Sequence, residues 1–450
     1  MILDTIAAIA TPFGTAGIAV IRVSGSDAIE KVNLIFKGRN LNKVKSHTVV
    51  YGHIIDQSSK VIDEVLVTIL KGPKTFTAED TVEISCHGGI LVTQKVLERV
   101  LETGIKLAEP GEFSKRAFVN GRIDLTQAEA IMDLIHAKNE NAMKLALSGL
   151  SGNIKKGIEA TRETVLNLVA KIEVNIDYPE YDDAQVMGNE VIKPEVIKIK
   201  DQLHTLLEDA DKGKIIREGV RTAIVGKPNV GKSSLLNALL NEERAIVTDI
   251  EGTTRDTIEA YINIGGITLN LVDTAGIRET KDVVEKIGVD RSKKAIESAE
   301  LVVLVLDQSR KLSKEDELLL EQTKNKKRII VGNKNDLERV LDLEGIHLLR
   351  LSTLTKEGLK DLEKEIIHVL GMGDIKDKDF NILSNVRHIA KIKDTIEALQ
   401  AVIDGIEMDM PIDIVEIDLK KAWQYLGEIT GDYHPEDLIS ELFSKFCLGK

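Results

Sequence analysis

A glycine-rich stretch at residues 226–233, GKPNVGKS, has the residue types and spacing of a phosphate-binding loop. It follows the apolar run 223–225 and precedes a helical pattern at 234–240. In that setting, backbone N–H groups and the positive end of the helix dipole face an anion, and Lys232 adds charge at the terminal phosphates. Ser233 is placed to ligate Mg²⁺. The expected nucleotide contacts are Asn229, Val230, Gly231, Lys232, Ser233 and Ser234.

Two downstream motifs disfavour the alternative of a strand-turn-helix that merely contains glycines, and they identify the nucleotide as GTP. Residues 273–276, DTAG, follow an apolar strand and place an acid near Mg²⁺ and a glycine N–H near the γ-phosphate. Residues 333–336, NKND, follow another strand, and an aspartate there suits the adjacent N–H donors of guanine, which adenine lacks. The expected contacts are Asp273, Thr274, Ala275, Gly276, Asn333, Lys334, Asn335, Asp336 and, after the next strand, Ser352.

The polar segment 248–256, TDIEGTTRD, lies between the first two motifs, where GTPases carry a switch loop that responds to the γ-phosphate. Thr254 is the candidate second protein ligand of Mg²⁺. An ordinary polar loop is the alternative, but the position of the segment favours the switch. The expected contacts are Thr248, Asp249, Ile250, Glu251, Gly252, Thr253 and Thr254.

The residue after the DTAG motif is Ile277, where Ras-type GTPases have a glutamine that orients the attacking water. An apolar side chain cannot do this, so hydrolysis needs a group from a partner or another residue of this chain. The nearby candidates from spacing alone are Arg278, Glu279, Asp282 and Glu285. Arg255 or Arg278 could also act as arginine fingers, although exposed arginines more often pair with acids.

The elements that must position these motifs predict a multidomain chain that combines α+β and α/β parts. Residues 1–118 mix strands near 17–23 and 64–70 with a helix at 91–101, which indicates an α+β domain. Residues 119–212 are expected to form the first part of a helical domain, in which helical stripes open with a capping-box pattern at Thr126–Glu129 and one helix covers 194–211. Residues 213–373 alternate strand and helix, as a doubly wound α/β domain does, and helices return over 374–450. The α/β domain is therefore expected to be inserted into a split helical domain.

Composition limits the cellular location and the kinds of partner that are expected for this chain. The chain has 450 residues, 43% of them hydrophobic, without an apolar run long enough to span a membrane. Its N-terminus lacks a basic region and only two cysteines occur, so we expect a cytoplasmic protein without a disulfide framework. The net charge of −13 argues against a surface devoted to nucleic acid, so a partner is expected to hold much of any bound RNA.

Several motifs together resemble those of the tRNA-modification GTPase family MnmE, also called TrmE. The nucleotide motifs GKPNVGKSS, GTTRD and DTAGIR fit several GTPases, but the C-terminal FCLGK at 446–450 is specific. The first domain matches the family too, through ATP at 10–12, IRVSG at 21–25, CHGG at 86–89, PGEF at 110–113 and NGRIDL at 120–125. The resemblance covers essentially the whole chain.

The resemblance implies an N-terminal domain that binds folate and forms a homodimer, a split helical domain and an inserted Ras-like GTPase domain activated by potassium. By the family pattern, K⁺ is bound by Asn229, Thr248, Ile250 and Thr253. The cation then occupies the place of an arginine finger. Glu285, in the sequence VEKIG, matches the family's catalytic acid, which orients water once two GTPase domains meet.

The resemblance also implies a folate of the 5-formyltetrahydrofolate type, with contacts from Arg22, Glu83, Arg122 and Lys450. Arginines suit the glutamyl carboxylates, and an acid suits the pterin N–H edge. Cys447 is either packed between its apolar neighbours or a nucleophile near the folate, and packing is favoured. His87, beside two glycines, is favoured as structural over catalytic.

With an FAD-dependent MnmG-like partner, the family adds carboxymethylaminomethyl or aminomethyl groups at C5 of wobble uridine in certain tRNAs. The sequence departs from the family at residues 352–354, STL instead of Ser-Ala, and at 433–435, YHP. The first departure is expected to loosen guanine binding slightly. A GTPase switch in ribosome assembly or signalling is the alternative function, which shares the nucleotide motifs but does not explain the first domain or the tail.

Overall fold

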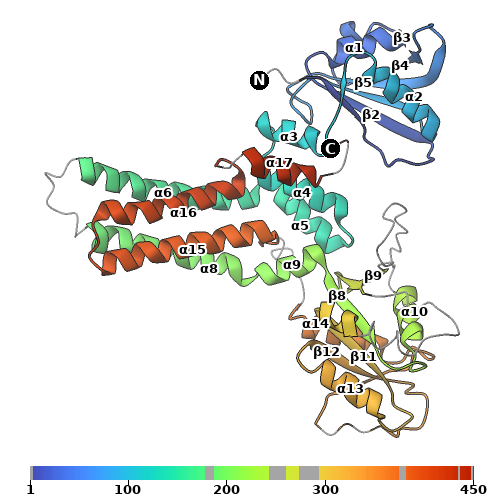
Figure 1. The fold of residues 1–450 in the computed structure, drawn as a ribbon, viewed down its shortest axis with the longest axis vertical. Coiled ribbons are helices and arrows are strands. Elements are labelled where there is room, and N and C mark those ends of the chain that lie inside the picture. Colours follow the sequence, from blue (N-terminus) through green and yellow to red (C-terminus); the bar gives the residue numbers. More distant parts are fainter. Residues whose placement is uncertain are drawn as a thin grey trace. The chain divides into compact units, whose positions relative to one another are not determined.

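The computed structural model describes residues 4–177, 187–242, 260–272, 293–341, 343, 345–373, 382–433, 436–446 and 449. The chain divides into two compact units (Figure 1). Unit 1 consists of residues 1–132 and 427–450, and unit 2 consists of residues 133–426. No helix in the described ranges is long and apolar enough to cross a membrane.

Unit 1 is built on a seven-stranded sheet in which only the pair of β1 and β7 is parallel. Burial alternates along its strands, as expected when one face is covered. The strands, in spatial order, are β3 (Phe36–Gly38), β4 (Thr48–Ile55), β5 (Val61–Leu70), β6 (Thr81–His87), β2 (Ile18–Ser24), β1 (Ile6–Ile9) and β7 (Lys106–Leu107).

Two helices, α1 (Ala28–Ile35) and α2 (Ile90–Leu101), cover one face of this sheet and form a core with residues such as Ile21, Val67 and Ile84. A short 3₁₀ helix, η1 (Leu41–Lys43), packs beside α1. The opposite face, called here the open face, carries the other set of alternating side chains, including Arg22 and Glu83, which are paired across β2 and β6.

The C-terminal part of unit 1 packs onto α3 (Glu112–Val119) through α17 (Glu436–Ser444). The Phe443 ring lies 6.2 Å from Phe118 and 4.9 Å from Phe446, measured between centroids. Gly111 has φ +69°, and a Cβ there would lie 2.3 Å from the carbonyl oxygen of Phe443. The close approach of the two segments therefore requires a glycine at this position.

Unit 2 contains a helical module formed by segments on both sides of the α/β domain. Its helices are α5 (Glu140–Leu150), α6 (Asn153–Asp177), the π-helical turn η2 (Met187–Ile192), α8 (Lys193–Glu208), α9 (Ala210–Glu218), α15 (Val386–Glu407) and α16 (Ile412–Thr430). Lys193 of α8 pairs with Glu407 of α15 at 2.8 Å, and the Arg162 guanidinium of α6 lies 4.2 Å from the Trp423 ring of α16. Helices far apart in sequence thus form one bundle (Figure 1).

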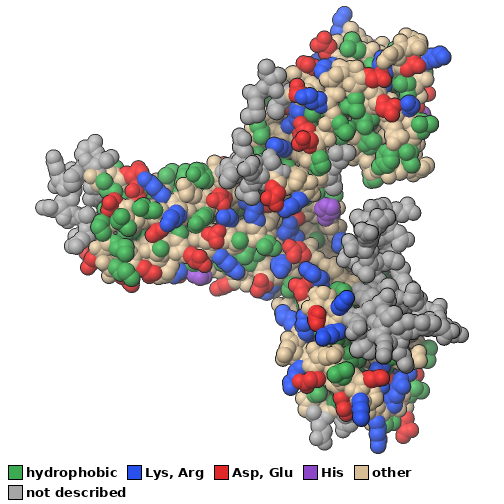
Figure 2. Space-filling model, in the orientation of Figure 1, with side chains coloured by type: hydrophobic (Ala, Val, Ile, Leu, Met, Phe, Trp, Pro, Cys, Tyr) green, Lys and Arg blue, Asp and Glu red, His purple; other side chains and the backbone are tan. Residues whose placement is uncertain are grey.

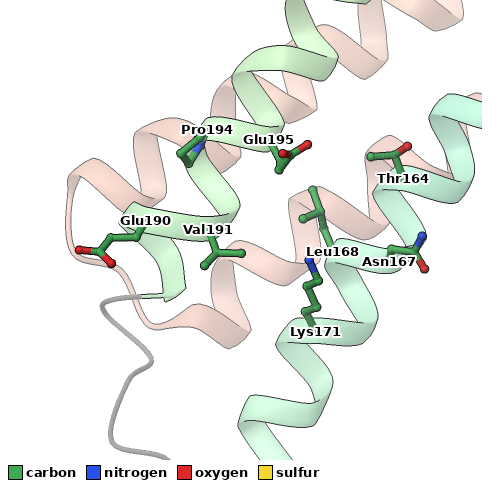
Figure 3. A pocket seen from close by; sticks show the side chains of 8 residues that line it. All are labelled: Thr164, Asn167, Leu168, Lys171, Glu190, Val191, Pro194 and Glu195. Carbon is green, nitrogen blue, oxygen red and sulfur yellow. The ribbon is translucent and has the colours of Figure 1, made fainter.

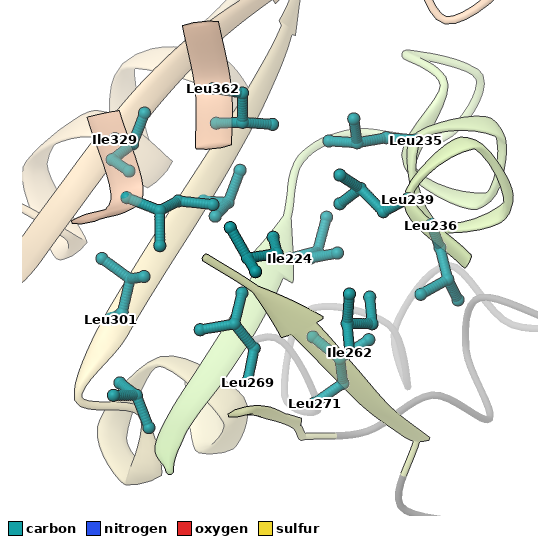
Figure 4. Packing of buried hydrophobic residues seen from close by; sticks show 14 of the residues in the cluster. Ile224, Leu235, Leu236, Leu239, Ile262, Leu269, Leu271, Leu301, Ile329 and Leu362 are labelled. Carbon is teal, nitrogen blue, oxygen red and sulfur yellow. The ribbon is translucent and has the colours of Figure 1, made fainter. Parts of the chain in front are cut away.

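The α/β domain of unit 2 has a six-stranded sheet that is parallel except for its edge strand β9. Helices α10 (Lys232–Glu242) and α14 (Leu359–Val369) cover one face, and α13 (Lys314–Gln322) lies on the other (Figure 4). The strands, in spatial order, are β13 (Leu349–Arg350), β12 (Lys327–Asn333), β11 (Leu301–Asp307), β8 (Val220–Val225), β10 (Ile267–Leu271) and β9 (Ala260–Ile264). The predicted fold class is confirmed, while the four domain boundaries stay predictions.

Two details of the helices differ from the sequence-based expectation. The helix predicted over 194–211 ends at Glu208, because Asp209 leaves the helical conformation and α9 starts at the next residue. The predicted capping box at Thr126–Glu129 is wrong. Helix α4 (Leu125–His136) is capped two residues earlier, by Asp124 and Gln127.

Asp124 and Gln127 form two reciprocal hydrogen bonds in this cap. The Gln127 N–H donates to Asp124 Oδ1 at 2.9 Å, and the Asp124 N–H donates to Gln127 Oε1 at 3.1 Å. The Thr126 hydroxyl also donates to Asp124 Oδ1, at 2.6 Å. Thr126 and Glu129 are therefore buried helix residues rather than a cap.

We expect Asp124→Ala to lower the free energy of unfolding by about 1 kcal/mol, because the cap loses its acceptor. Asp124→Asn, which keeps a side-chain oxygen at the same position, should cost much less. Urea unfolding of the full chain, followed by circular dichroism, measures both. Equal losses for the two variants would show that the carboxylate charge, not the cap, is what matters.

Candidate functional site

The phosphate-binding loop lies between the end of β8 at Val225 and the start of α10 at Lys232. Gly226 has φ +153° and Gly231 has φ +100°. A Cβ at Gly226 would lie 2.4 Å from the Val305 carbonyl oxygen, and one at Gly231 would lie 2.1 Å from Asn333 Nδ2. Both positions therefore require glycine, and the loop is held close to the sheet edge.

Lys232 spans this loop from the first turn of α10. Its ammonium donates to the carbonyl oxygens of Gly226, at 2.8 Å, and Lys227, at 2.7 Å. Burial lowers the pKa of the Lys232 ammonium. Within the described part of the chain this partly buried cation is held by backbone carbonyls at a helix N-terminus, and such a cation is suited to bind an anion.

Lys227 fixes the other side of the loop to α13. Its ammonium lies 2.7 Å from Asp316 Oδ2 and 2.7 Å from the Ser313 hydroxyl oxygen. Asp316 is also the N3 residue of the α13 capping box, in which it accepts from the Ser313 N–H. Because the Lys227–Asp316 pair is almost buried, it anchors the loop more firmly than an exposed ion pair would. No spacing in the sequence indicates this contact.

Asn333, at the end of β12, joins three loops. Its side-chain amide donates to the Val230 carbonyl at 2.8 Å, and its Oδ1 accepts from the Thr353 N–H at 3.1 Å. The residue is only 1% exposed. The phosphate-binding loop, the NKND motif and the segment after β13 are therefore held together by one buried amide.

Lys334 and Asp307 pair next to this amide, at the ends of β12 and β11. The Lys334 ammonium lies 2.7 Å from Asp307 Oδ2. Burial alone would raise the pKa of the Asp307 carboxyl, but hydrogen bonds from Lys334 and Ser309 outweigh it and lower the pKa to about 2. The adjacent Gln308 donates to Asn335 Oδ1 at 2.9 Å. Asp307 and Gln308 were missed from the sequence, although their position at a strand's carboxyl end was a usable signal.

Asp336 is oriented by Ser352. The Ser352 hydroxyl, which is fully buried, donates to Asp336 Oδ1 at 2.5 Å and accepts from the Thr355 N–H at 3.2 Å. The carboxylate proposed to bind guanine thus has a fixed plane. The departure at residues 352–354 leaves this arrangement intact, because Thr353 uses its backbone N–H and not its side chain to reach Asn333.

The structure thus brings together the predicted residues of the phosphate-binding loop with Asn333, Lys334, Asn335, Asp336 and Ser352. Asn229 lies in this loop with φ +64°, a left-handed conformation that asparagine tolerates better than most residues. Thr248–Thr254, Asp273–Gly276, Ile277 and Glu285 lie outside the described residues.

A second polar site lies on the open face of unit 1. Arg22 Nη2 lies 2.9 Å from Glu83 Oε1, and Arg22 Nη1 donates to the Gly449 carbonyl at 3.2 Å. The rings of Phe76 and Phe113 each lie 5.8 Å from the guanidinium carbon. A charged pair that lies beside an aromatic ring and contacts Gly449 of the C-terminal segment is suited to a polar ligand.

The other residues predicted for this site are placed differently. Arg122 is exposed, and among the described residues its side chain makes no hydrogen bond or ion pair with Arg22 or Glu83. Lys450 and Cys447 lie outside the described residues, as do His434 and Pro435. Cys86 is buried, and burial raises the pKa of its thiol.

His87 is bound by Asp63 at the end of β6. The imidazole Nδ1 lies 2.7 Å from Asp63 Oδ1, and the His87 backbone N–H donates to Asp63 Oδ2 at 2.8 Å. The hydrogen bond to Asp63 raises the pKa of His87. Both carboxylate oxygens thus fasten the strand end, which supports the structural interpretation of this histidine.

The helical module has a cavity of about 440 Å³ between α6 and the segment η2–α8 (Figure 3). Its walls combine apolar residues, Leu168 and Val191, with charged ones, Lys171 and Glu190. These charged side chains are exposed to solvent. Across the described ranges no group of three His, Cys, Asp or Glu side chains is arranged to hold a metal ion. We therefore do not take this cavity as the candidate functional site.

Solved structures similar to this chain include GTP-binding domains. The G domain of the FeoB iron transporter of T. maritima is 29% identical, with 33% of this chain and 98% of that chain covered and a TM-score of 0.25. A variant of Era from Aquifex aeolicus, bound to GDP and AlF4⁻, is 27% identical, with 40% of this chain and 67% of that chain covered and a TM-score of 0.26.

Two family models match most of the chain. The model of the GTP-binding protein TrmE N-terminus matches residues 5–122, and that of the MnmE helical domain matches residues 125–447. The tRNA modification GTPase MnmE of Acholeplasma laidlawii is 62% identical over 450 residues, covering 100% of both chains. The enzyme of the same name from Streptococcus thermophilus is 52% identical over 450 residues, covering 99% of this chain and 98% of the relative. On this similarity along its whole length, the chain belongs to the MnmE, or TrmE, family of tRNA modification GTPases.

Proposed function

We propose that this chain is a potassium-activated GTPase that acts with an MnmG-like, FAD-dependent partner. Together they add a carboxymethylaminomethyl or aminomethyl group at C5 of wobble uridine in certain tRNAs. The observation that carries the proposal is the buried Asn333 amide, which joins the phosphate-binding loop to the segment that fixes Asp336. Membership of the family supports the reaction assigned to the complex. The partner is proposed to hold much of the tRNA, since this chain carries a net charge of −13.

As a GTPase, the chain binds GTP and Mg²⁺, and its own residues fit them. The loop glycines let backbone N–H groups approach phosphates, and Lys232 supplies the positive charge. Ser233 lies in the first turn of α10, where its hydroxyl suits Mg²⁺, with Thr254 proposed as the second ligand. Asp336, held by Ser352, presents a carboxylate to the guanine edge.

Hydrolysis in this proposal depends on K⁺ and on an acid outside the usual position. Asn229 and oxygens of Thr248, Ile250 and Thr253 are proposed to bind K⁺, which balances charge that develops between the β- and γ-phosphates. The left-handed backbone at Asn229 supports a specific role for its side chain. Glu285 is proposed to orient water, because Ile277 cannot.

Unit 1 is proposed to bind a folate of the 5-formyltetrahydrofolate type. Arg22 and Glu83 offer a guanidinium and a carboxylate beside the Phe76 ring, and these charged groups suit the carboxylates and the N–H edge of a folate. Arg122 and Lys450 are proposed as further contacts. The exposure of Arg122 fits a ligand that extends beyond the pocket.

The homodimer is proposed to form through unit 1. Apolar side chains on the open face support this, since Ile18 is 63% exposed and Leu66 is 48% exposed, with Tyr51 paired beside Leu66 across two strands. Figure 2 shows hydrophobic side chains in groups on the surface of this unit. A sheet face of this kind is suited to a second copy. A monomeric mass in sedimentation equilibrium would contradict the dimer.

A GTPase switch in ribosome assembly or signalling remains the second candidate, because it would use the same nucleotide site. It offers no role for the Arg22–Glu83 pair or for the C-terminal segment that contacts it. This second site favours the tRNA-modifying function.

Deletion of the gene should remove the C5 substituent from wobble uridines, as measured by mass spectrometry of nucleosides from purified tRNA. Reintroduction of the wild-type gene should restore it, whereas a Lys232→Ala version should not, because the phosphates lose their cation. Unchanged wobble uridines in the deletion strain would exclude the proposed function and leave the switch.

Potassium should stimulate GTP hydrolysis far more than sodium does, and Asn229→Gly should remove that difference. Glycine accepts the left-handed backbone at this position, so the variant loses the side-chain oxygen without added strain. Asn229→Ala should behave alike, with an extra cost of roughly 1 kcal/mol from strain. Phosphate release in the two salts measures the rates, and equal wild-type rates would refute the potassium site.

Glu285→Ala is the companion variant in the same assay. It should keep nucleotide affinity while turnover collapses in both salts. If this variant hydrolyses GTP normally, the water-orienting group must be sought elsewhere.

Arg22→Lys should weaken binding of 5-formyltetrahydrofolate about tenfold or more, because a lysine keeps the charge but loses the paired Nε and Nη2 donation that holds the Glu83 carboxylate in place. Calorimetric titration of the full chain measures this affinity. Arg39→Lys, at an exposed arginine of the same unit, is the matched control and should bind as the wild type does. Equal affinity of the Arg22 and Arg39 variants would remove Arg22 from the site.

A further inference from the structure

The N-terminal end of α5 docks on the hairpin formed by β9 and β10. The two strands are antiparallel, with Ile264 opposite Ile267, and turn through Gly265 and Gly266. Both elements belong to unit 2. The helical module and the α/β domain therefore share a contact besides the two points where the chain passes between them.

A closed set of hydrogen bonds forms the centre of this contact. Asn139 Nδ2 donates to the Thr268 hydroxyl oxygen at 2.8 Å, and that hydroxyl donates to Asn263 Oδ1 at 2.9 Å. Asn263 Nδ2 then donates to the Lys138 carbonyl at 2.9 Å. Thr268 is 2% exposed, so the hydroxyl at the centre of this chain of bonds is protected from water, while Asn139 and Asn263 are half-buried.

The tip of the hairpin is held by a separate bond. Asn141 Nδ2 donates to the Gly266 carbonyl at 3.1 Å. Gly266 has φ +80°, and a Cβ there would lie 2.1 Å from Asn141 Nδ2, so a side chain at this position would displace the Asn141 amide. In addition, the Lys138 ammonium lies 3.3 Å from the centre of the Tyr261 ring.

Packing below these bonds makes the contact continuous with the core of the α/β domain. Leu145 of α5 is buried in the same cluster as Val220 of β8 and Leu269 of β10. The hairpin strand β10 pairs directly with β8, which leads into the phosphate-binding loop. Leu145 of α5 thus belongs to the same buried core as the strands that lead to the nucleotide site.

The hairpin lies between the predicted switch segment and the DTAG motif in the sequence, so its contact with α5 is close to both. Residue 260, the first of β9, follows the predicted switch segment, and β10 ends two residues before the DTAG motif. The predicted switch segment and the DTAG motif are therefore joined directly to strands that bind α5, at Gly266 in the hairpin tip and at Thr268 in β10. A nucleotide-dependent change in either segment would reach these strands. Such a contact acts on nucleotide affinity only if it differs between nucleotide states.

We propose that Asn139, Asn141 and Thr268 are positioning residues through which the helical module sets the relative affinity of the nucleotide site for GTP and GDP. The proposal rests on the proposed GTPase function and adds its regulation. Coupling of this kind is reciprocal, because a contact that differs between the GTP and GDP states must change the two affinities unequally. A contact that only stabilises the fold changes both affinities alike.

The test measures the dissociation constants of GDP and of a non-hydrolysable GTP analogue for the full chain. Asn141→Ala removes the tip bond at a half-buried position, and Thr268→Val removes the central hydroxyl with little change in shape. In each variant the ratio of the two constants should change about fivefold or more. Thr268→Ser, which keeps the hydroxyl, should restore the wild-type ratio.

Asn385→Ala is the matched control. Asn385 caps α15 in the same helical module, by accepting from the Arg387 N–H at 2.9 Å, so its loss weakens a helix end without touching the hairpin. This variant should leave the ratio unchanged. The proposal would be overturned if the ratio of the two dissociation constants were unchanged in both Asn141→Ala and Thr268→Val. It would also be overturned if the ratio changed equally in the control.

Hydrogen exchange separates failure of this proposal from failure of the proposed function. In the wild type, amide protection of residues 140–150 should differ between the GDP-bound protein and the analogue-bound protein. In Thr268→Val this difference should disappear. The nucleotide should still protect residues 226–233 in that variant. If the difference in amide protection of α5 persists in Thr268→Val, the proposed regulation by the helical module is overturned, and the proposed GTPase function is not. If nucleotide protects neither segment of the wild type, GTP binding itself is excluded.

Discussion

The nucleotide site depends on the buried side chain of Asn333. An amide with both ends hydrogen-bonded away from water is costly to leave unsatisfied, at roughly 1–3 kcal/mol for each unpaired group. Its two bonds reach a carbonyl of the phosphate-binding loop and an amide after β13, so the loops cannot shift independently. The glycine at 231 follows from the same bond, because any side chain there would collide with the amide. The sheet order makes this possible by placing the carboxyl ends of β8, β11 and β12 along one edge.

Much of this site could be predicted from the sequence because its signals are local. A strand, a glycine-rich loop and a helix follow each other within about twenty residues, and the NKND motif directly follows its own strand. The alternation of strand and helix over residues 213–373 is also predictable from the sequence, since buried parallel strands are continuous apolar runs. The capping box was misplaced because a Thr-x-x-Glu pattern and an Asp-x-x-Gln pattern overlap, and burial selects the second.

Contacts between distant segments could not be predicted in this way. Lys227 and Asp316 lie far apart in the sequence, and neither stands out from the many charged residues of the chain. Likewise, no spacing connects Arg22 with Phe76, or Asn139 with Thr268. In each case the pairing is decided by the order of strands and the docking of a helix, which a linear pattern does not contain. The sequence predicted which residues carry charge or amides, and the fold decides which of them meet.

The bond between Arg22 and the Gly449 carbonyl has a consequence for the way the chain is made. The two residues are separated by 427 positions, and the α17 segment that packs on α3 follows the α/β domain in the sequence. During translation the α/β domain, which is continuous in sequence, can fold while the sheet of unit 1 still lacks α17. The bond between Arg22 and Gly449 therefore forms only after residues 133–426, which make up unit 2, have been synthesised. Until then Arg22 can pair with Glu83, its neighbour across β2 and β6, but not with the C-terminal segment.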